Sequence, residues 1–166
     1  MTPRWPVTLR DGHVGLRPLR LRDNARWREV RMRNAEWLRQ WEATSPEPER
    51  DVAPTYAAMV RRLRGEAREG RTMPFVVTWD GDLVGQLTVG GIAWGSLRSA
   101  HIGYWVDQRV AGRGIMPTAV ALATDHCFAT GLHRIEINIR PENIASRRVV
   151  EKLGFRPAGL RPAYLH

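Results

Sequence analysis

The sequence has a single cysteine and no long apolar run. One cysteine, Cys127, excludes an intrachain disulfide bond. It falls in the apolar stretch 119–129, where a packed and reduced thiol is expected. No apolar run approaches the roughly 18 residues that span a membrane, and residues 1–10 lack the hydrophobic segment of a signal peptide. We therefore expect a soluble cytoplasmic protein.

Lysine is almost absent as well, because Lys152 is the only one. The chain nevertheless carries 26 basic against 17 acidic residues, a net charge of +9, which favours anionic partners such as nucleic acid, an acidic protein or a phosphorylated ligand. No block of five or six like charges occurs, and residues 61–70 interleave arginine with glutamate. Nucleic-acid binding is therefore a secondary expectation.

The 166 residues predict one domain covering 1–166, since no internal repeat or long linker divides them. In the first half, apolar spacing predicts a strand within 13–23 with Val14, Leu16 and Leu19 on one side. Asp23 is the expected cap of the helix that follows. The predicted segments are helices over 24–34 and 35–41, a loop over 44–50, and an amphipathic helix over 52–69.

In the second half, strand patterns follow the helical patterns of the first. The pair Asp80-Gly81 predicts the turn of an antiparallel hairpin formed by 73–79 and 83–94. Further segments follow in the order strand, helix, strand, helix and extended chain, at 99–107, 118–129, 133–141, 143–154 and 155–166. This order predicts an α+β (mixed α/β) protein with a mostly antiparallel sheet flanked by helices.

A glycine-bearing stretch, "GRGIMP" at 112–117, lies between a predicted strand and a predicted helix. It is either a plain turn or a set of bare backbone amides that hold an anion at a helix N-terminus. The stretch lacks the lysine of a Walker loop, and Thr118 replaces the third glycine of a G-x-G-x-x-G pattern. Taken alone, it favours the turn.

A second motif, "PENIASRRVVEKLGF" at 141–155, follows the next strand. Together with "HIGYWV", "GRGIM" and "TAVAL", it resembles the GNAT family of acetyl-CoA-dependent N-acetyltransferases, most closely the RimJ/RimL ribosomal-protein group. The resemblance covers most of the chain. It implies a GNAT-like twisted sheet, acetyl-CoA as cosubstrate and no metal.

The resemblance also implies where the cosubstrate binds. The family signature [QR]-x-x-G-x-[GA] falls on 111–116, with Ala111 in place of the polar residue and Met116 in place of the small one. A register at 109–114 satisfies the signature literally but disturbs the alignment with the preceding strand. The implied cosubstrate-binding residues are Trp105, Val106, Ala111, Gly112, Arg113, Gly114, Ile115, Met116, Pro117, Thr118, Asn143 and Ser146.

The implied chemistry is direct acetyl transfer from a thioester to a primary amine. The Val106 N–H corresponds to the oxyanion donor, and Ser146 corresponds to the acid that protonates the CoA thiolate. Valine stands at position 150, where many family members have a tyrosine, and this places more weight on Ser146. The base stays open between Glu136, Tyr104, His101, ordered water and a residue of the missing C-terminal segment. The expected catalytic residues are Ser146, Glu136 and Tyr104.

The amine that receives the acetyl group is inferred from its expected pKa and from the family resemblance. A protein α-amino group, with a pKa near 8, is partly neutral at pH 7 and needs less help than lysine. We therefore expect the N-terminus of a protein, which the RimJ/RimL resemblance makes ribosomal. The alternatives are a small amine such as an aminoglycoside or polyamine, a non-catalytic basic nucleic-acid or ribosome-binding module, and an inactive acetyl-CoA-binding relative.

Tryptophans and arginines around the implied site each allow two interpretations. The tryptophans Trp27, Trp37 and Trp41 are expected to shape acceptor specificity, although two tryptophans four residues apart, as in the last two, are more often core anchors than ligand contacts. Arg147 and Arg148 are either cofactor-phosphate contacts or solvated helix residues. Family members continue past His166, so the last hairpin is expected to be missing, and the protein is expected to be a monomer or homodimer.

Overall fold

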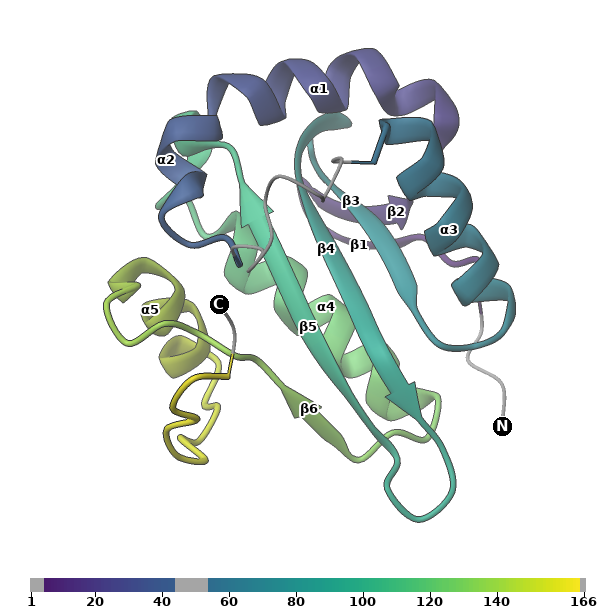
Figure 1. The fold of residues 1–166 in the computed structure, drawn as a ribbon, viewed down its shortest axis with the longest axis vertical. Helices are drawn as coiled ribbons and strands as arrows, with labels where there is room; N and C mark the ends of the chain where they lie inside the picture. The colour runs from purple at the N-terminus through teal and green to yellow at the C-terminus, as the bar shows by residue number, and fades with distance from the viewer. Residues whose placement is uncertain (1–4, 44–53, 165–166) are drawn as a thin grey trace.

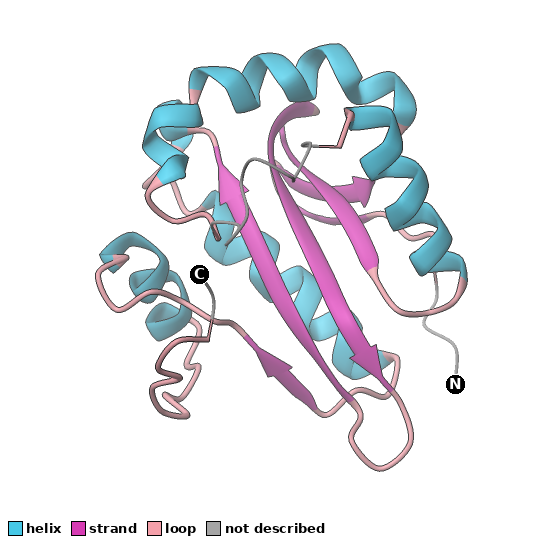
Figure 2. Cartoon of the chain, in the orientation of Figure 1, coloured by secondary structure: helices cyan, strands magenta, loops and turns pink. Residues whose placement is uncertain are grey.

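The computed structural model describes residues 5–43 and 54–164 (Figure 1). A central sheet carries helices on both faces, as the fold prediction requires (Figure 2). Its strands are β1 Leu9–Asp11, β2 Val14–Pro18, β3 Met73–Trp79, β4 Asp82–Ala93, β5 Ser99–Val106 and β6 Arg134–Glu136. Its helices are α1 Asn24–Arg33, α2 Ala35–Arg39, α3 Tyr56–Arg68, α4 Ile115–Ala129 and α5 Ile144–Lys152, with single 3₁₀ turns at Leu21–Asp23 and Gln108–Val110.

The six strands follow chain order across the sheet. Every neighbouring pair from β1 to β5 is antiparallel, and β6 alone runs parallel to β5. The predicted hairpin of β3 and β4 is confirmed. Asp80 and Gly81 both have positive φ, at 49° and 85°, as the favoured two-residue hairpin turn requires.

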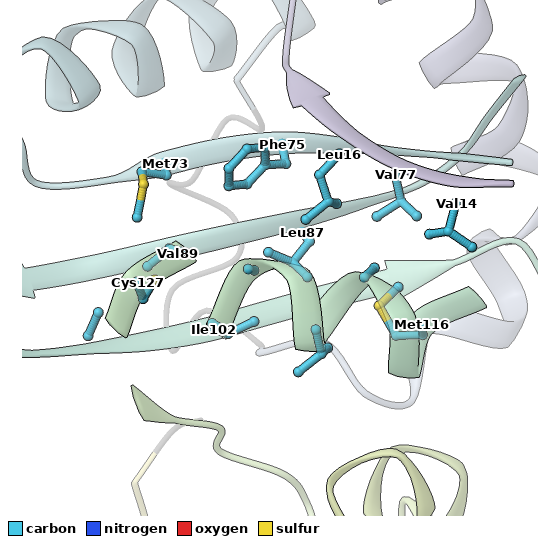
Figure 3. Packing of buried hydrophobic residues seen from close by; sticks show 14 of the residues in the cluster. Val14, Leu16, Met73, Phe75, Val77, Leu87, Val89, Ile102, Met116 and Cys127 are labelled. Atoms are coloured by element: carbon cyan, nitrogen blue, oxygen red, sulfur yellow. The ribbon is translucent and has the colours of Figure 1, made fainter. Parts of the chain in front are cut away.

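The main core lies between the sheet and α4 (Figure 3). Alternate residues of β3 face α4, among them Phe75 and Val77, because side chains along a strand point to opposite faces in turn. Leu87 of β4 and Met116 of α4 join them, and Cys127 is fully buried in this cluster as expected.

A second cluster covers the opposite face, where α1 and α3 pack. Val76, which lies between Phe75 and Val77 in β3, turns to this face and belongs to the same buried cluster as Val60 of α3. Leu19 also belongs here. The prediction that Leu19 shares a side with Val14 is wrong, because β2 ends at Pro18 and the strand alternation stops there.

Two further details differ from the sequence-based expectations. The Asp23 carboxylate does not cap α1. It accepts hydrogen bonds from the Arg17 guanidinium at 2.8 Å and from the Arg20 N–H at 2.9 Å. Strand β1 was not predicted, because three residues of mixed character carry too little periodicity to show a strand.

Several boundaries also shift. Helix α3 begins at Tyr56 rather than 52, and the Thr55 hydroxyl accepts from the Ala58 N–H at its start. The predicted loop at 44–50 lies outside the described residues. Residues 155–161 form no regular strand or helix. Among the described residues, no helix combines the length and the apolar character that crossing a membrane requires.

Candidate active site in the split between β5 and β6

Strands β5 and β6 pair over only three residues. The register joins Ser99 to Arg134 and ends with His101 opposite Glu136, after which the chain at 137–141 leaves β5. The strand predicted over 133–141 is therefore much shorter than expected. The two segments form a split that widens toward α2 and α5 (Figure 1).

Two cavities open at this split. The larger, of about 540 Å³, is lined by the end of α2, the end of β5, the loop before α4 with the first turn of α4, and one side of α5 along its whole length. The smaller, of about 410 Å³, lies between the middle of β5, residues 137–141 and residues 159–161. Four residues line both cavities, so the cavities meet at Trp41, Tyr104, Asn143 and Ser146.

The glycine stretch forms one wall of the larger cavity. Gly112 and Gly114 have φ of 77° and 76°, a left-handed conformation that glycine adopts without strain. A Cβ added at either position would meet nothing within 4 Å, so the backbone here faces open space. Gly114 is also the N-cap of α4, where backbone N–H groups have no helical acceptor and the helix dipole favours an anion.

Two of the implied cosubstrate-binding residues offer no free amide. Pro117 has no N–H, and Thr118 uses both its N–H and its hydroxyl to donate to the Gly114 carbonyl, at 3.2 and 2.9 Å. The amides of 113–116 are left. The Arg113 guanidinium lies 5.1 Å from the centre of the Trp79 ring, and Arg113 does not line the cavity.

The end of β5 presents its backbone to the split. The Asp107 N–H donates to Val84 O on β4 at 2.7 Å. Because N–H directions alternate along a strand, the Val106 N–H points to the opposite edge of β5, which β6 does not pair. Trp105 and Val106 both line the larger cavity.

Helix α5 begins beside that edge. The Asn143 side-chain oxygen accepts from the Ser146 N–H at 3.1 Å, so Asn143 is the N-cap, as expected from sequence. The Tyr104 hydroxyl donates to Ser146 O at 3.5 Å. Burial raises the pKa of Tyr104, which keeps this phenol protonated and makes it a proton donor rather than a base at neutral pH.

Two predicted catalytic candidates lie elsewhere. Glu136 lines neither of these cavities, and its carboxylate accepts from Arg134 and Arg161, each at 2.8 Å. These two guanidinium groups hold the pKa of Glu136 below its ordinary value, which weakens it as a base. His101 is exposed and lies against Gly90 and Gly91, in the part of β5 that pairs with β6.

Some of the predicted tryptophans and arginines line the larger cavity and others do not. Trp37 and Trp41 are half-buried and line the larger cavity, so the core-anchor interpretation is wrong for them. Trp27 instead packs on Trp105 and donates its indole N–H to Gln86 at 2.8 Å. Arg148 lines the larger cavity, whereas Arg147 donates to Pro141 O and does not line it.

The structure also contains a hydrogen-bonded cluster that the sequence did not indicate. It joins Arg33 and Asn34, at the junction of α1 and α2, to Asp107 after β5, and we call it the clasp. The Asn34 amide donates to Asp107 at 3.0 Å and its oxygen accepts from the Gln108 N–H at 2.9 Å, while Arg33 pairs with the same carboxylate. Burial by itself raises the pKa of Asp107, but the hydrogen bonds from Arg33 and Asn34 outweigh it and hold the pKa low.

Two other kinds of reactive site were considered in the described residues, a nucleophilic cysteine and a metal centre. Cys127 is fully buried, and burial raises the pKa of its thiol to about 12. An unreactive thiol of this kind is not a nucleophile. No group of three or more histidine, cysteine, aspartate or glutamate side chains in the described ranges has the arrangement that holds a metal ion.

Comparison with known proteins agrees with this architecture. A family model described as an acetyltransferase (GNAT) domain matches residues 13–156. The structure of Mycobacterium smegmatis RimJ in complex with CoA-disulfide superposes with a TM-score of 0.92 at 44% sequence identity, covering 99% of this chain and 83% of that one.

Two curated relatives extend the comparison. The probable N-acetyltransferase YjcK of Bacillus subtilis is 43% identical over 49% of this chain, a match that spans only 45% of its own length. The ribosomal protein uS5-alanine N-acetyltransferase of Escherichia coli is 26% identical over 96% of this chain and 83% of its own length. The chain belongs to the GNAT family of acetyltransferases and is of the RimJ/RimL type within it.

Proposed function

We propose that the protein transfers the acetyl group of acetyl-CoA directly to the N-terminal α-amino group of a protein, and that this protein is ribosomal. The observation that carries the proposal is the meeting of two cavities at Tyr104 and Ser146, one bounded by bare amides and the other open to a second molecule. In support, the similar M. smegmatis RimJ forms a complex with CoA-disulfide, and the E. coli relative is an alanine N-acetyltransferase of ribosomal protein uS5.

Acetyl-CoA would occupy the larger cavity. Its diphosphate would accept hydrogen bonds from the amides of 113–116, where the α4 dipole adds to the attraction. Arg148 and Lys152 line the same cavity and supply positive charge for the remaining phosphate. The Asn143 oxygen is occupied by its cap, which leaves its NH₂ group for the pantetheine arm.

Besides the thioester, the reaction needs the acceptor amine, a donor to the oxyanion and a proton donor to the thiolate, all at the place where the two cavities meet. The acceptor amine attacks the thioester carbonyl, and the Val106 N–H stabilises the oxyanion that forms. When the tetrahedral intermediate collapses, the C–S bond breaks, and the Ser146 hydroxyl protonates the departing thiolate and takes a proton back from the water that receives the amine proton. Tyr104, protonated and adjacent to Ser146, is the alternative donor. Because Cys127 is buried and inert, an acetyl-cysteine intermediate is not part of the proposal.

The basic lining favours a peptide over a polycation. Among the residues that the structure describes, four basic side chains and one acid line the two cavities: Arg140, Arg148, Lys152, Arg161 and Glu142. A polyamine or aminoglycoside would be repelled by this excess of positive charge. No Asp or Glu in the described ranges stands at the junction itself, so water is the expected acceptor of the amine proton.

A binding assay joined to an activity assay tests the proposal. Acetyl-CoA should raise the melting temperature, because a ligand that binds only the folded state stabilises it. Release of free CoA thiol should then require a peptide with a free N-terminus, and should stop when that N-terminus is blocked. Faster turnover of a polyamine or an aminoglycoside would contradict the proposed acceptor. Stabilisation without turnover of any amine would indicate an inactive relative, and salt-sensitive RNA binding without stabilisation by acetyl-CoA would indicate a nucleic-acid module.

A further inference from the structure

The smaller cavity is positively charged. Arg140 and Arg161 contribute to its wall, and no aspartate or glutamate in the described residues does so. The rest of the wall is apolar or uncharged, including Ile102 and Ile139. A low-dielectric wall strengthens the field that two guanidinium groups produce inside it.

The charge of Arg140 is not cancelled by an acid in the described ranges. Its two terminal nitrogens donate to backbone carbonyls, those of Gln40 at 3.1 Å and Glu42 at 3.0 Å. Both acceptors are neutral, so these bonds fix the guanidinium beside Trp41 without neutralising it. The side chain keeps further N–H donors.

The charge of Arg161 is only partly cancelled. It donates to Glu136 at 2.8 Å, but that carboxylate is shared with Arg134, so two cations surround one anion. The Arg161 side chain is 47% exposed and stacks on the Tyr164 ring at 5.2 Å. It is therefore within reach of an incoming molecule.

These charges act on an acceptor in two ways. A cation near an amine disfavours its protonated form, which raises the fraction of neutral amine without a general base. The same cations attract a carboxylate carried by the acceptor, and arginine matches a carboxylate in a two-bond geometry. Nucleic acid is also anionic, but it offers no aliphatic primary amine to the junction.

We propose that the smaller cavity binds an acceptor polypeptide whose first residues after the reacting amine include acidic side chains, held by Arg140 and Arg161. This proposal rests on the proposed acetyltransferase function and adds the class of acceptor sequence. The amine reaches Tyr104 and Ser146 at the junction, and the carboxylates trail into the smaller cavity.

The experiment compares three peptides of one length with the same small first residue. Their second and third residues are Asp-Glu, Asn-Gln or Lys-Arg, and kcat/KM is measured by CoA release at saturating acetyl-CoA. We expect the acidic peptide to exceed the amide peptide by about tenfold, which corresponds to about 1.4 kcal/mol, and the basic peptide to be slowest.

Variants assign the effect to the two arginines. Arg140→Gln and Arg161→Gln should each reduce the ratio between acidic and amide peptides, and the double variant should bring it near one. Arg140→Lys keeps the charge and should retain most of the preference. The control is Arg68→Gln, in an exposed position at the end of α3, which should leave the ratio unchanged.

The outcomes separate the two proposals. Turnover of no amine at all would overturn the proposed function. Equal turnover of the three peptides would overturn only the acidic acceptor, as would an acidic preference that survives in the double variant. Competition of a short RNA with the acidic peptide, lost in the double variant, would mean that the cavity serves nucleic acid and would also overturn it.

Discussion

At the scale of single residues, Gly114 has a left-handed backbone conformation and lies beside open space at the N-terminus of α4. Its φ of 76° costs about 1–2 kcal/mol for an L-residue, and its missing Cβ leaves room where a diphosphate would approach. We predict that Gly114→Val loses most of the rise in melting temperature that acetyl-CoA gives the parent protein.

The matched control for that variant is Gly65→Ala in α3. A Cβ at Gly65 meets nothing within 4 Å, and alanine favours helix over glycine by about 0.5–1 kcal/mol. This variant should be slightly more stable than the parent and equally stabilised by acetyl-CoA. An unchanged response to acetyl-CoA in Gly114→Val would remove the loop from the binding site.

Ser146 and Tyr104 can be separated by kinetics. If Ser146 protonates the thiolate, Ser146→Ala should lower kcat about 100-fold or more while KM for acetyl-CoA changes little. Tyr104→Phe should then have a smaller effect on kcat. The reverse order would assign the proton to Tyr104, whose raised pKa suits a donor. Steady-state rates with a fixed peptide decide between them.

Among these residues, the sequence predicted some positions and missed others for a physical reason. Asn143 and Gly114 were predictable because a cap and a helix start are local features. The base was not, because Glu136 on the polar side of a strand looks available until Arg134 and Arg161 are placed around it. Arg161 is 25 residues away in the chain.

At the scale of elements, strand β4 presses directly on the strand that carries the proposed oxyanion donor. A Cβ at Gly85 would stand 2.3 Å from the Trp105 carbonyl oxygen and 3.1 Å from Val106 Cα. Because both neighbours are backbone, the strands would have to separate. We predict that Gly85→Ala costs about 1–3 kcal/mol of stability and lowers kcat more than Gly65→Ala does.

Urea unfolding and peptide turnover, measured on the same preparation, check this prediction. A second glycine on the sheet, Gly103, provides the comparison for the urea unfolding alone, because a Cβ there meets nothing within 4 Å but Gly103 lines the smaller cavity. If Gly85→Ala proved as stable as the parent, the close approach of β4 and β5 would not constrain the site.

The clasp of Asp107 with Arg33 and Asn34 joins the start of α2, which carries Trp37 and is followed by Trp41, to the end of β5. Asp107 has a lowered pKa, so its contribution to stability is complete above the ordinary aspartate value of about 4 and is lost as the pH falls through the lower folded value. Asp107→Asn should destabilise by about 3 kcal/mol at pH 7, because it leaves Arg33 without its carboxylate.

The pH dependence distinguishes this electrostatic effect from a packing effect. The gap in unfolding free energy between parent and Asp107→Asn should narrow below about pH 4, where Asp107 gains a proton in the unfolded parent before it does in the folded one. A gap that stays constant from pH 7 to about pH 3 would show that packing, not charge, accounts for it. Urea titrations across this range make the measurement.

The sequence predicted those helices and strands whose limits are set by neighbouring residues, such as turns, caps and apolar alternation. The turn at Asp80-Gly81 and the alternation of β3 were enough for the hairpin, and a cap and a glycine delimited α5. The length of β6 was not predictable, because its apolar alternation continues to Ile139 while its pairing with β5 stops at Glu136. The clasp was missed because its partners lie more than 70 residues apart.

At the scale of the whole molecule, the net charge of +9 acts on an anionic cosubstrate before any contact forms. Exposed charges are screened over about 10 Å at 0.1 M salt. We predict that the affinity for acetyl-CoA falls several-fold between about 0.05 and 0.5 M salt, and that S-acetylpantetheine, which lacks the phosphates, shows a much smaller change. Calorimetry on both ligands checks this, and equal salt dependence would contradict it.

The burial of Cys127 also bears on how the chemistry is observed. A disulfide reagent such as Ellman's reacts with thiolate, and the only sulfhydryl of the chain is inside the α4 core with a pKa of about 12. The folded protein should therefore develop no colour of its own over minutes, and each increment in absorbance would report a molecule of CoA set free. A rising blank would signal unfolding rather than turnover.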